Sequence, residues 1–139
     1  MNYKIIGKYI KHLNFKIPNP KTFFLLTKDI TNYKINIDIK SNRVKENILE
    51  VVTSIMLNPT KDNFEKIEAR IEFATIIEVL SNQVENKDME EIILIKVPTE
   101  IYSELRTIFI SLFESSGFKD VKINEKVDFQ KLYDMRKIQ

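Results

Sequence analysis

Apolar and polar residues alternate near the start of the chain, between Tyr9 and Ile17. One parity is apolar and the other is polar: Leu13, Phe15 and Ile17 against His12, Asn14 and Lys16. Since successive side chains of a strand point to opposite faces, this pattern predicts a strand with one apolar and one polar face. Two prolines, Pro18 and Pro20, follow. Proline lacks the N–H that a sheet ladder needs, so we expect the strand to end there.

Three more segments alternate in the same way. The second strand is expected over Tyr33–Ser41, and the third over Ile48–Leu57, where β-branched residues are frequent. Phe64–Leu80 is rich in Glu, Lys, Ala and Arg, which favour a helix, but its apolar residues keep one parity over a long stretch. We therefore predict a fourth strand, with a helix as the alternative. The apolar segment Lys21–Tyr33, which contains FFLL, is expected to be irregular.

Helical spacing replaces alternation in the last third of the chain. Between Pro98 and Gly117 the apolar residues recur at intervals of three and four, which is typical of an amphipathic helix: Ile101, Tyr102, Leu105, Ile108, Phe109, Leu112 and Phe113. Proline suits the first turn of a helix, and glycine suits its end. Asp128 is expected to cap a short last helix. The segment Met89–Val97 fits either a short helix or an extended lead-in.

The order of the predicted elements indicates the fold class. Strands in a run followed by helices are typical of an α+β domain with an antiparallel sheet. The chain has 139 residues, which is the size of one ordinary domain, and it shows no repeat or linker. We therefore predict a single domain over residues 1–139.

Composition excludes several classes of function. A net charge of +2 lacks the basic excess of a nucleic-acid-binding protein, and no apolar run approaches the ~20 residues of a membrane span. The N-terminus does not resemble a signal peptide and there is no cysteine, so a cytoplasmic location is expected. The single histidine, His12, lies on a polar strand face. We therefore predict no catalytic residues, no metal site, no cofactor and no enzymatic activity.

The motifs together resemble the SecB family of protein-export chaperones. YIKHLNFKIPNP is similar to the family's first strand and turn, through Tyr9, Leu13, Phe15, Pro18 and Asn19. INIDI and ILEVVTSIML resemble the next two strands, and VDFQKLY resembles the start of the closing helix. The resemblance extends from Tyr9 to Tyr133.

This resemblance implies a four-stranded antiparallel sheet with helices packed on one face, and a homotetramer built as a dimer of dimers. It implies an ATP-independent holdase that binds unfolded polypeptides or preproteins in apolar grooves. Carried onto this chain, the groove residues are Phe23, Phe24, Leu26, Ile35, Ile37, Phe129 and Leu132. The long helix is expected to contribute to the oligomer interface through Tyr102, Leu105, Phe109 and Leu112.

One surface departs from the family pattern. Export members dock the Sec translocation ATPase through acidic residues on the polar sheet face, whereas the matching positions here are His12, Lys16 and Arg70. A docking face that is no longer acidic is expected to select a different partner. The first hypothesis is therefore a holdase in protein export. The alternative is a SecB-like chaperone dedicated to the antitoxin of a toxin–antitoxin system, and the third hypothesis is a non-enzymatic interaction module on the same fold.

Overall fold

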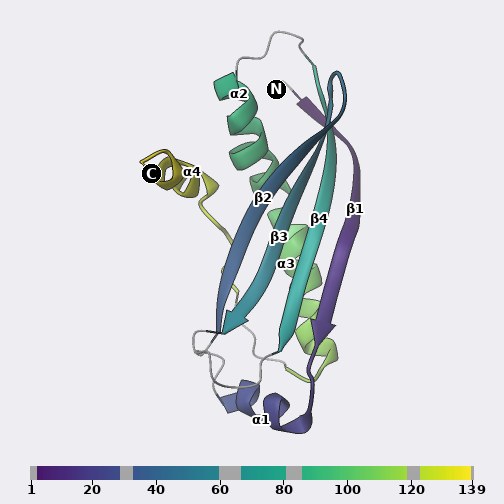
Figure 1. Ribbon diagram of the computed structural model, residues 1–139, viewed down its shortest axis with the longest axis vertical. Coiled ribbons are helices and arrows are strands. Elements are labelled where there is room, and N and C mark those ends of the chain that lie inside the picture. The colour runs from purple at the N-terminus through teal and green to yellow at the C-terminus, as the bar shows by residue number, and fades with distance from the viewer. Residues whose placement is uncertain (1–2, 29–32, 60–66, 81–85, 119–122, 139) are drawn as a thin grey trace.

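The computed structural model describes residues 3–28, 33–59, 67–80, 86–118 and 123–138 (Figure 1). Four strands come first, interrupted by one helix, and the remaining helices follow. The elements in chain order are β1 (Tyr3–Lys16), α1 (Pro20–Lys28), β2 (Tyr33–Lys45), β3 (Ile48–Pro59), β4 (Glu68–Val79), α2 (Asn86–Glu91), the π-helical turn η2 (Ile92–Lys96), α3 (Val97–Ser115) and α4 (Phe129–Ile138).

The four strands form one antiparallel sheet in the order β1-β4-β3-β2. The predicted α+β class with a four-stranded antiparallel sheet is thus confirmed. Residues 68–79 of the ambiguous segment form a strand, so the helical alternative is wrong there. Tertiary pairing decided this, because β4 lies between β1 and β3 and every second side chain enters the core.

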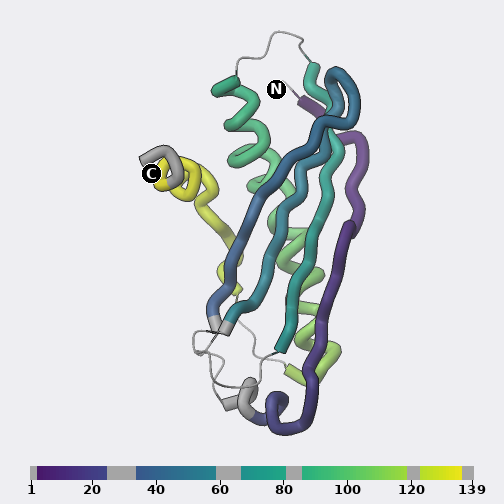
Figure 2. Tube along the Cα trace, viewed as in Figure 1, coloured from purple at the N-terminus to yellow at the C-terminus, as the bar shows by residue number. Residues whose placement is uncertain are grey.

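One helical layer covers one face of the sheet. The segments α2, η2 and α3 follow one another without a break, and α3 crosses β3 and β4 (Figure 2). Beneath α3 the sheet contributes alternate residues of β3, all buried: Leu49, Val51, Thr53, Ile55 and Leu57. The helix contributes its buried stripe: Val97, Ile101, Leu105, Phe109 and Phe113. Burial of this apolar area, at ~25 cal/mol per Å², is the main force holding the layers together.

The segment after the first strand is a helix, and the expectation of an irregular segment is wrong. The side-chain oxygen of Asn19 accepts two hydrogen bonds from Thr22. One comes from the backbone N–H of Thr22, at 2.9 Å, and the other from the Thr22 hydroxyl. Pro20 occupies the first helical position. An asparagine N-cap followed by proline is a standard helix start, so Pro18 and Pro20 end β1 and also begin α1.

Strand β1 is longer than predicted and carries two irregularities. It begins at Tyr3, and its pairing with β4 shifts between Ile5 and Gly7 and again between Ile10 and His12. Each shift changes which parity faces the helices. Ile10 and Leu13 therefore share the helix-side face although their numbers differ in parity. Alternation alone could not show this over the N-terminal half of the strand.

The C-terminal helices follow the sequence signals closely. Asp128 caps α4 by accepting the N–H of Lys131 in its carboxylate, at 2.9 Å. Gly117 follows α3 with a φ of 93°, a left-handed conformation that glycine adopts easily. The segment 89–97 is helical throughout, so the extended alternative is wrong. Among the described residues, no helix is long and apolar enough to span a membrane.

Candidate peptide-binding groove

A groove lies between the edge strand β2 and the helical segments α2, η2 and α4. Its larger part, about 680 Å³, is lined by Ile39, Lys40, Ser41, Asn42, Glu90, Ile93, Leu94 and Tyr133. Its smaller part, about 240 Å³, is lined by Ile37, Asp38, Ile39, Leu94, Leu132 and Tyr133. The two parts share Ile39, Leu94 and Tyr133, so we treat them as one feature, the β2 groove.

The position of α3 explains why this groove exists. The long helix crosses β3 and β4, whereas β2 is contacted on its helix side by η2. Ile37 and Ile39 pair with Ile55 and Thr53 of β3 and therefore point to the helix side of the sheet. Ile37 packs against the core cluster that contains Phe109, and Ile39 packs against the one that contains Val97, but both remain half-buried and form the apolar floor of the β2 groove.

The β2 groove also includes the outer edge of the strand. Its lining contains every residue from Ile37 to Asn42. Successive side chains point to opposite faces, so a continuous run includes residues whose side chains do not face the helices. These residues belong to the outer strand of the sheet. An edge strand presents unpaired N–H and C=O groups, which can bind the main chain of an extended peptide.

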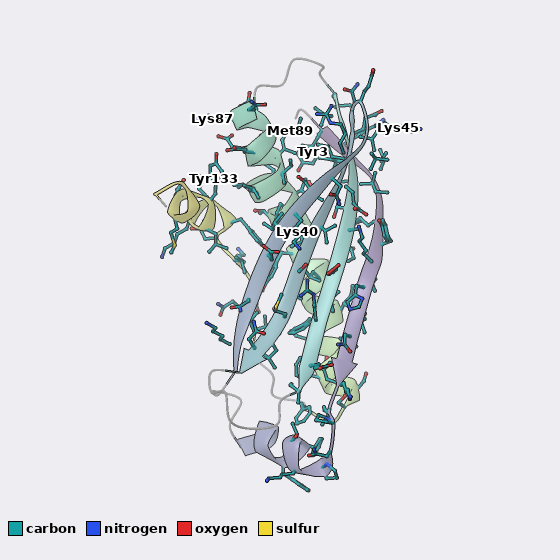
Figure 3. All side chains as sticks on the ribbon, viewed as in Figure 1. Tyr3, Lys40, Lys45, Lys87, Met89 and Tyr133 are labelled. Atoms are coloured by element: carbon teal, nitrogen blue, oxygen red, sulfur yellow. The ribbon has the colours of Figure 1, made fainter. Side chains whose placement is uncertain are left out.

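Helix α4 forms the opposite wall and is anchored at two points. The buried ring of Phe129 packs against Tyr102 of α3, with ring centroids 6.0 Å apart. The hydroxyl of Tyr133 donates to Glu90 Oε2 of α2 at 2.8 Å, and Figure 3 shows Tyr133 between the two helices. This hydrogen bond raises the pKa of the Tyr133 phenol above its usual value. The wall is thus positioned by contacts with α2 and α3.

The apolar residues of α4 divide between its two sides. Phe129 and Tyr133 are buried toward the body of the protein, whereas Leu132 and Met135 are 45% and 53% exposed. Only Leu132 of the exposed pair lines the β2 groove. An exposed leucine beside an apolar floor is a contact point for an apolar side chain of a bound chain.

The structure brings together some of the predicted groove residues and separates others. Ile37 and Leu132 line the same hollow, and Ile35 lies further along the same face of β2, partly exposed. Phe129 is 2% exposed, so it supports the wall from behind and offers no binding surface, contrary to the prediction.

The remaining predicted groove residues belong to α1, at the far end of the sheet (Figure 1). Phe23 packs against Phe118 with ring centroids 4.8 Å apart, and Phe24 is 61% exposed. Leu26 belongs to α1, but its side chain lies outside the described part of the structure. Phe24 is therefore a separate apolar point, beyond the lining of the β2 groove.

Several groove residues were missed from the sequence. Ile39 continues the apolar parity of Ile35 and Ile37, and Tyr133 follows Leu132, so both had a signal. Ile93 and Leu94 had none, because their segment fits either a short helix or an extended lead-in by its sequence. Their contribution depends on how η2 is oriented toward β2.

Three of the four residues predicted for an oligomer interface lie inside the protomer. Tyr102, Leu105 and Phe109 are buried between α3 and the sheet or α4, and only Leu112 remains half-buried. Side chains already covered by their own subunit cannot form a contact surface. Four of the exposed apolar side chains in the described part of the chain lie on the edge strand β1: Ile6, Tyr9, Ile10 and Leu13.

The predicted docking residues share the open face of the sheet, opposite the helices. His12 pairs with Glu72, Lys16 pairs with Glu68, and Arg70 pairs with Asn14 between them. Arg70 also forms an ion pair with Glu72 at 2.9 Å. Lys16 and Arg70 therefore lie beside the carboxylates Glu68 and Glu72 on this part of the face. Among the described residues, no cluster of His, Cys, Asp and Glu could hold a metal ion.

The chain is similar over its full length to one protein family. A family model described as "Preprotein translocase subunit SecB" matches residues 1–139. The "Putative protein-export protein SecB" of Pelagibacter ubique is 38% identical over 135 residues, which cover 97% of this chain and 96% of that one. The "Protein-export protein SecB" of Burkholderia lata is 26% identical over 136 residues, covering 96% of this chain and 81% of that one.

A solved structure shares the fold. It is the SecB-like chaperone Rv1957 of Mycobacterium tuberculosis in complex with a ChAD peptide from the antitoxin HigA1, with a TM-score of 0.64 and 10% sequence identity. The match covers 88% of this chain and 90% of that one. At this identity the likeness establishes the common architecture.

Proposed function

Because this chain belongs to the SecB family, we propose that it is an ATP-independent chaperone that holds unfolded polypeptides in the β2 groove and serves protein export. The observation that carries the proposal is the combination, in one hollow, of an apolar floor, an exposed leucine and a free strand edge. A holdase must recognise the unfolded state of many clients. Apolar contacts and main-chain hydrogen bonds do so without requiring a particular sequence.

The geometry suits an extended segment of client. Its main chain would pair with the outer edge of β2, and alternate side chains would turn toward Ile37, Ile39 and Leu94. Burial of each apolar side chain contributes ~25 cal/mol per Å². Because β2 spans Tyr33–Lys45, several client residues can bind in succession. The exposed Phe24 of α1 is a second contact point for a longer client.

The proposal includes a homotetramer assembled as a dimer of dimers. The exposed apolar side chains on β1 support an interface at that edge of the sheet. An apolar edge strand is a template for pairing with another chain, and a second protomer would satisfy both its backbone and its side chains. Leu112 is the residue of the predicted helix set that remains available for such a contact.

The partner that docks on the open face distinguishes two forms of the function. We place the export function in the cytoplasm, with preproteins as clients and the Sec translocation ATPase as partner. The mixed charge around His12, Lys16 and Arg70 favours a second candidate, in which the chaperone serves an antitoxin and does not need the ATPase. In that case these three residues dock another partner.

The experiment is a titration with a permanently unfolded probe, a reduced and carboxymethylated model protein, followed by fluorescence anisotropy. Saturable binding without ATP is expected, together with suppressed aggregation of a heat-denatured enzyme. Absence of both effects at equimolar tetramer would overturn the chaperone function. Binding to purified Sec ATPase then separates the two forms, since the antitoxin form predicts none.

A further inference from the structure

Two fully buried residues of the helical layer are separated by an unusual interval. Ile92 and Val97 are both 0% exposed and belong to the same core cluster. In an α-helix five residues advance about 500°, so two such residues would point about 140° apart. Here the backbone N–H of Val97 bonds to the carbonyl of Ile92, which closes a π-helical turn. Five residues then complete roughly one turn, and both side chains point at the sheet.

The spacing of the buried residues in α3 indicates which residues a regular α-helix would bury in the preceding turn. Its buried residues follow Val97 at intervals of four: Ile101, Leu105, Phe109 and Phe113. Continued backward, this interval would put Ile93 into the core and turn Ile92 toward solvent. It would also rotate α2 by about 100°, moving Glu90 away from Tyr133.

The extra residue of the π turn instead leaves two apolar side chains beside the core. Ile92 fills the core position, while Ile93 and Leu94 line the β2 groove. Leu94 lines both parts of the groove, between Ile39 of β2 and Tyr133 of α4. Segment η2 contacts both β2 and α4, so it lies between the strand that forms the floor of the groove and the helix that forms its opposite wall.

We propose that the π-helical turn η2 supplies a second apolar helical wall of the β2 groove, beside α4, and makes Leu94 a contact residue for bound polypeptide. This inference rests on the proposed holdase function and gives the structural reason why Leu94 belongs to its site. It assigns a role to the one irregularity of the long helical segment. π-Helical turns are rare, and when they occur inside α-helices they are frequent at functional sites.

The sequence supplies a local reason for the turn. Pro98 has no N–H, so the carbonyl of Leu94, four residues earlier, lacks its usual α-helical donor. The hydroxyl of Thr99 also donates to the carbonyl of Ile95. Regular α-helical bonding is thus weakened within the turn. Burial of Ile92 in the core then favours the wider turn over a continuous α-helix.

Deletion of Lys96 tests the role of the turn. Lys96 is exposed, and its removal leaves Ile92 four residues before Val97, so a regular α-helix keeps Ile92 and Glu90 in place. Leu94 would then rotate by roughly 55° about the helix axis relative to Ile92, since two residues advance about 200° in an α-helix and about 145° in the π turn. We expect both the folded deletion variant and Leu94→Ala to bind the carboxymethylated probe roughly five-fold or more weakly than the wild type, since about 1 kcal/mol of lost apolar contact is about five-fold in affinity. The matched control, Lys96→Ala, keeps the turn and should bind like the wild type.

The outcomes distinguish the proposed role of the π turn from the proposed holdase function. If the deletion variant binds like the wild type while Leu94→Ala is weakened, the turn does not supply the wall and the inference is overturned. Deletion of Ile95 is the second variant, because it also removes one residue from the turn. If neither deletion variant folds, the turn is a requirement of the fold and the inference is again overturned. Failure of the wild type to bind the probe overturns both the inference and the function.

Discussion

Lys11 on β1 and Glu50 on β3 are joined across the intervening strand β4, with Lys11 Nζ 2.8 Å from Glu50 Oε1. Tyr9 of β1 donates its hydroxyl to the same carboxylate, and Asn42 of β2 donates its amide at 3.2 Å. The Glu50 network therefore joins both edge strands to the centre of the sheet on its open face. The hydrogen bonds from Lys11 and Tyr9 hold the pKa of Glu50 at about 2, against an ordinary 4.5.

This network predicts a pH-dependent contribution to stability. Since the folded pKa of Glu50 is below its unfolded value, the contribution is present above pH 4.5 and is lost as the pH falls toward 2. Urea unfolding of the wild type and Glu50→Gln should show a constant difference in unfolding free energy from pH 7 to 5, and a shrinking one below. Glu78→Gln removes an exposed ion pair with Lys4 and should cost under about 1 kcal/mol. If the difference in unfolding free energy between the wild type and Glu50→Gln stays constant down to pH 3, the lowered pKa of Glu50 is contradicted.

The β2 groove predicts unequal effects for two exposed residues of α4. Leu132→Ser should weaken binding of an unfolded probe about five-fold, because ~1 kcal/mol of apolar contact is lost. Met135→Ser is the matched control, since Met135 is equally exposed but outside the groove lining. Both should unfold like the wild type. Equal loss of affinity in the two variants would show that α4 binds clients through a general apolar surface.

The burial of α3 predicts that its central aromatic residue affects stability and not assembly. Phe109→Ala should reduce the free energy of unfolding by about 3–5 kcal/mol, because the ring is fully buried beneath the helix. Leu112→Ser, at a half-buried position of the same helix, should cost far less stability and weaken association instead. Chemical denaturation and sizing at several concentrations measure the two quantities. If the Phe109→Ala variant keeps its stability but dissociates, the prediction is wrong and Phe109 belongs to the oligomer interface.

The exposed edge of β1 predicts where protomers associate. Ile10→Lys places a charge on an apolar edge strand and should shift the protein to smaller species in light scattering, with an unchanged circular dichroism spectrum. Val44→Lys, at the outer edge strand β2, is the control and should leave the oligomer intact. Dissociation by Val44→Lys alone would place the interface at β2. That edge would then be unavailable to clients.

Local patterns were sufficient for most of the secondary structure. The alternation on β3 and β4 identified both strands, because each packs one face under α3. The Asn19–Pro20 start of α1 is a local signal too, but the same prolines also end a strand, and the sequence alone does not separate the two roles. The shifts in β1 left no signal, because a bulge depends on the register with β4.

The groove was predictable only in part. Ile37 and Leu132 were identified through the resemblance to a family, and the structure places them in one hollow. Phe129 was misplaced, because spacing along a helix shows which residues share a face but not which neighbour covers it. Ile93 and Leu94 depend on a π turn, whose i to i+5 bond involves the conformation of the whole segment.

The sequence by itself determined the fold class, the buried faces of β3 and α3, and the membership of the SecB family, because these follow from periodicity, capping residues and motifs that are local in the chain. Only the tertiary structure decided which apolar residues remain exposed. Whether Leu105 is core and Leu94 is groove depends on where α3 crosses the sheet and on the turn that precedes it. Both residues are leucines on the same helical segment, and packing against β2, β3 and β4 distinguishes them.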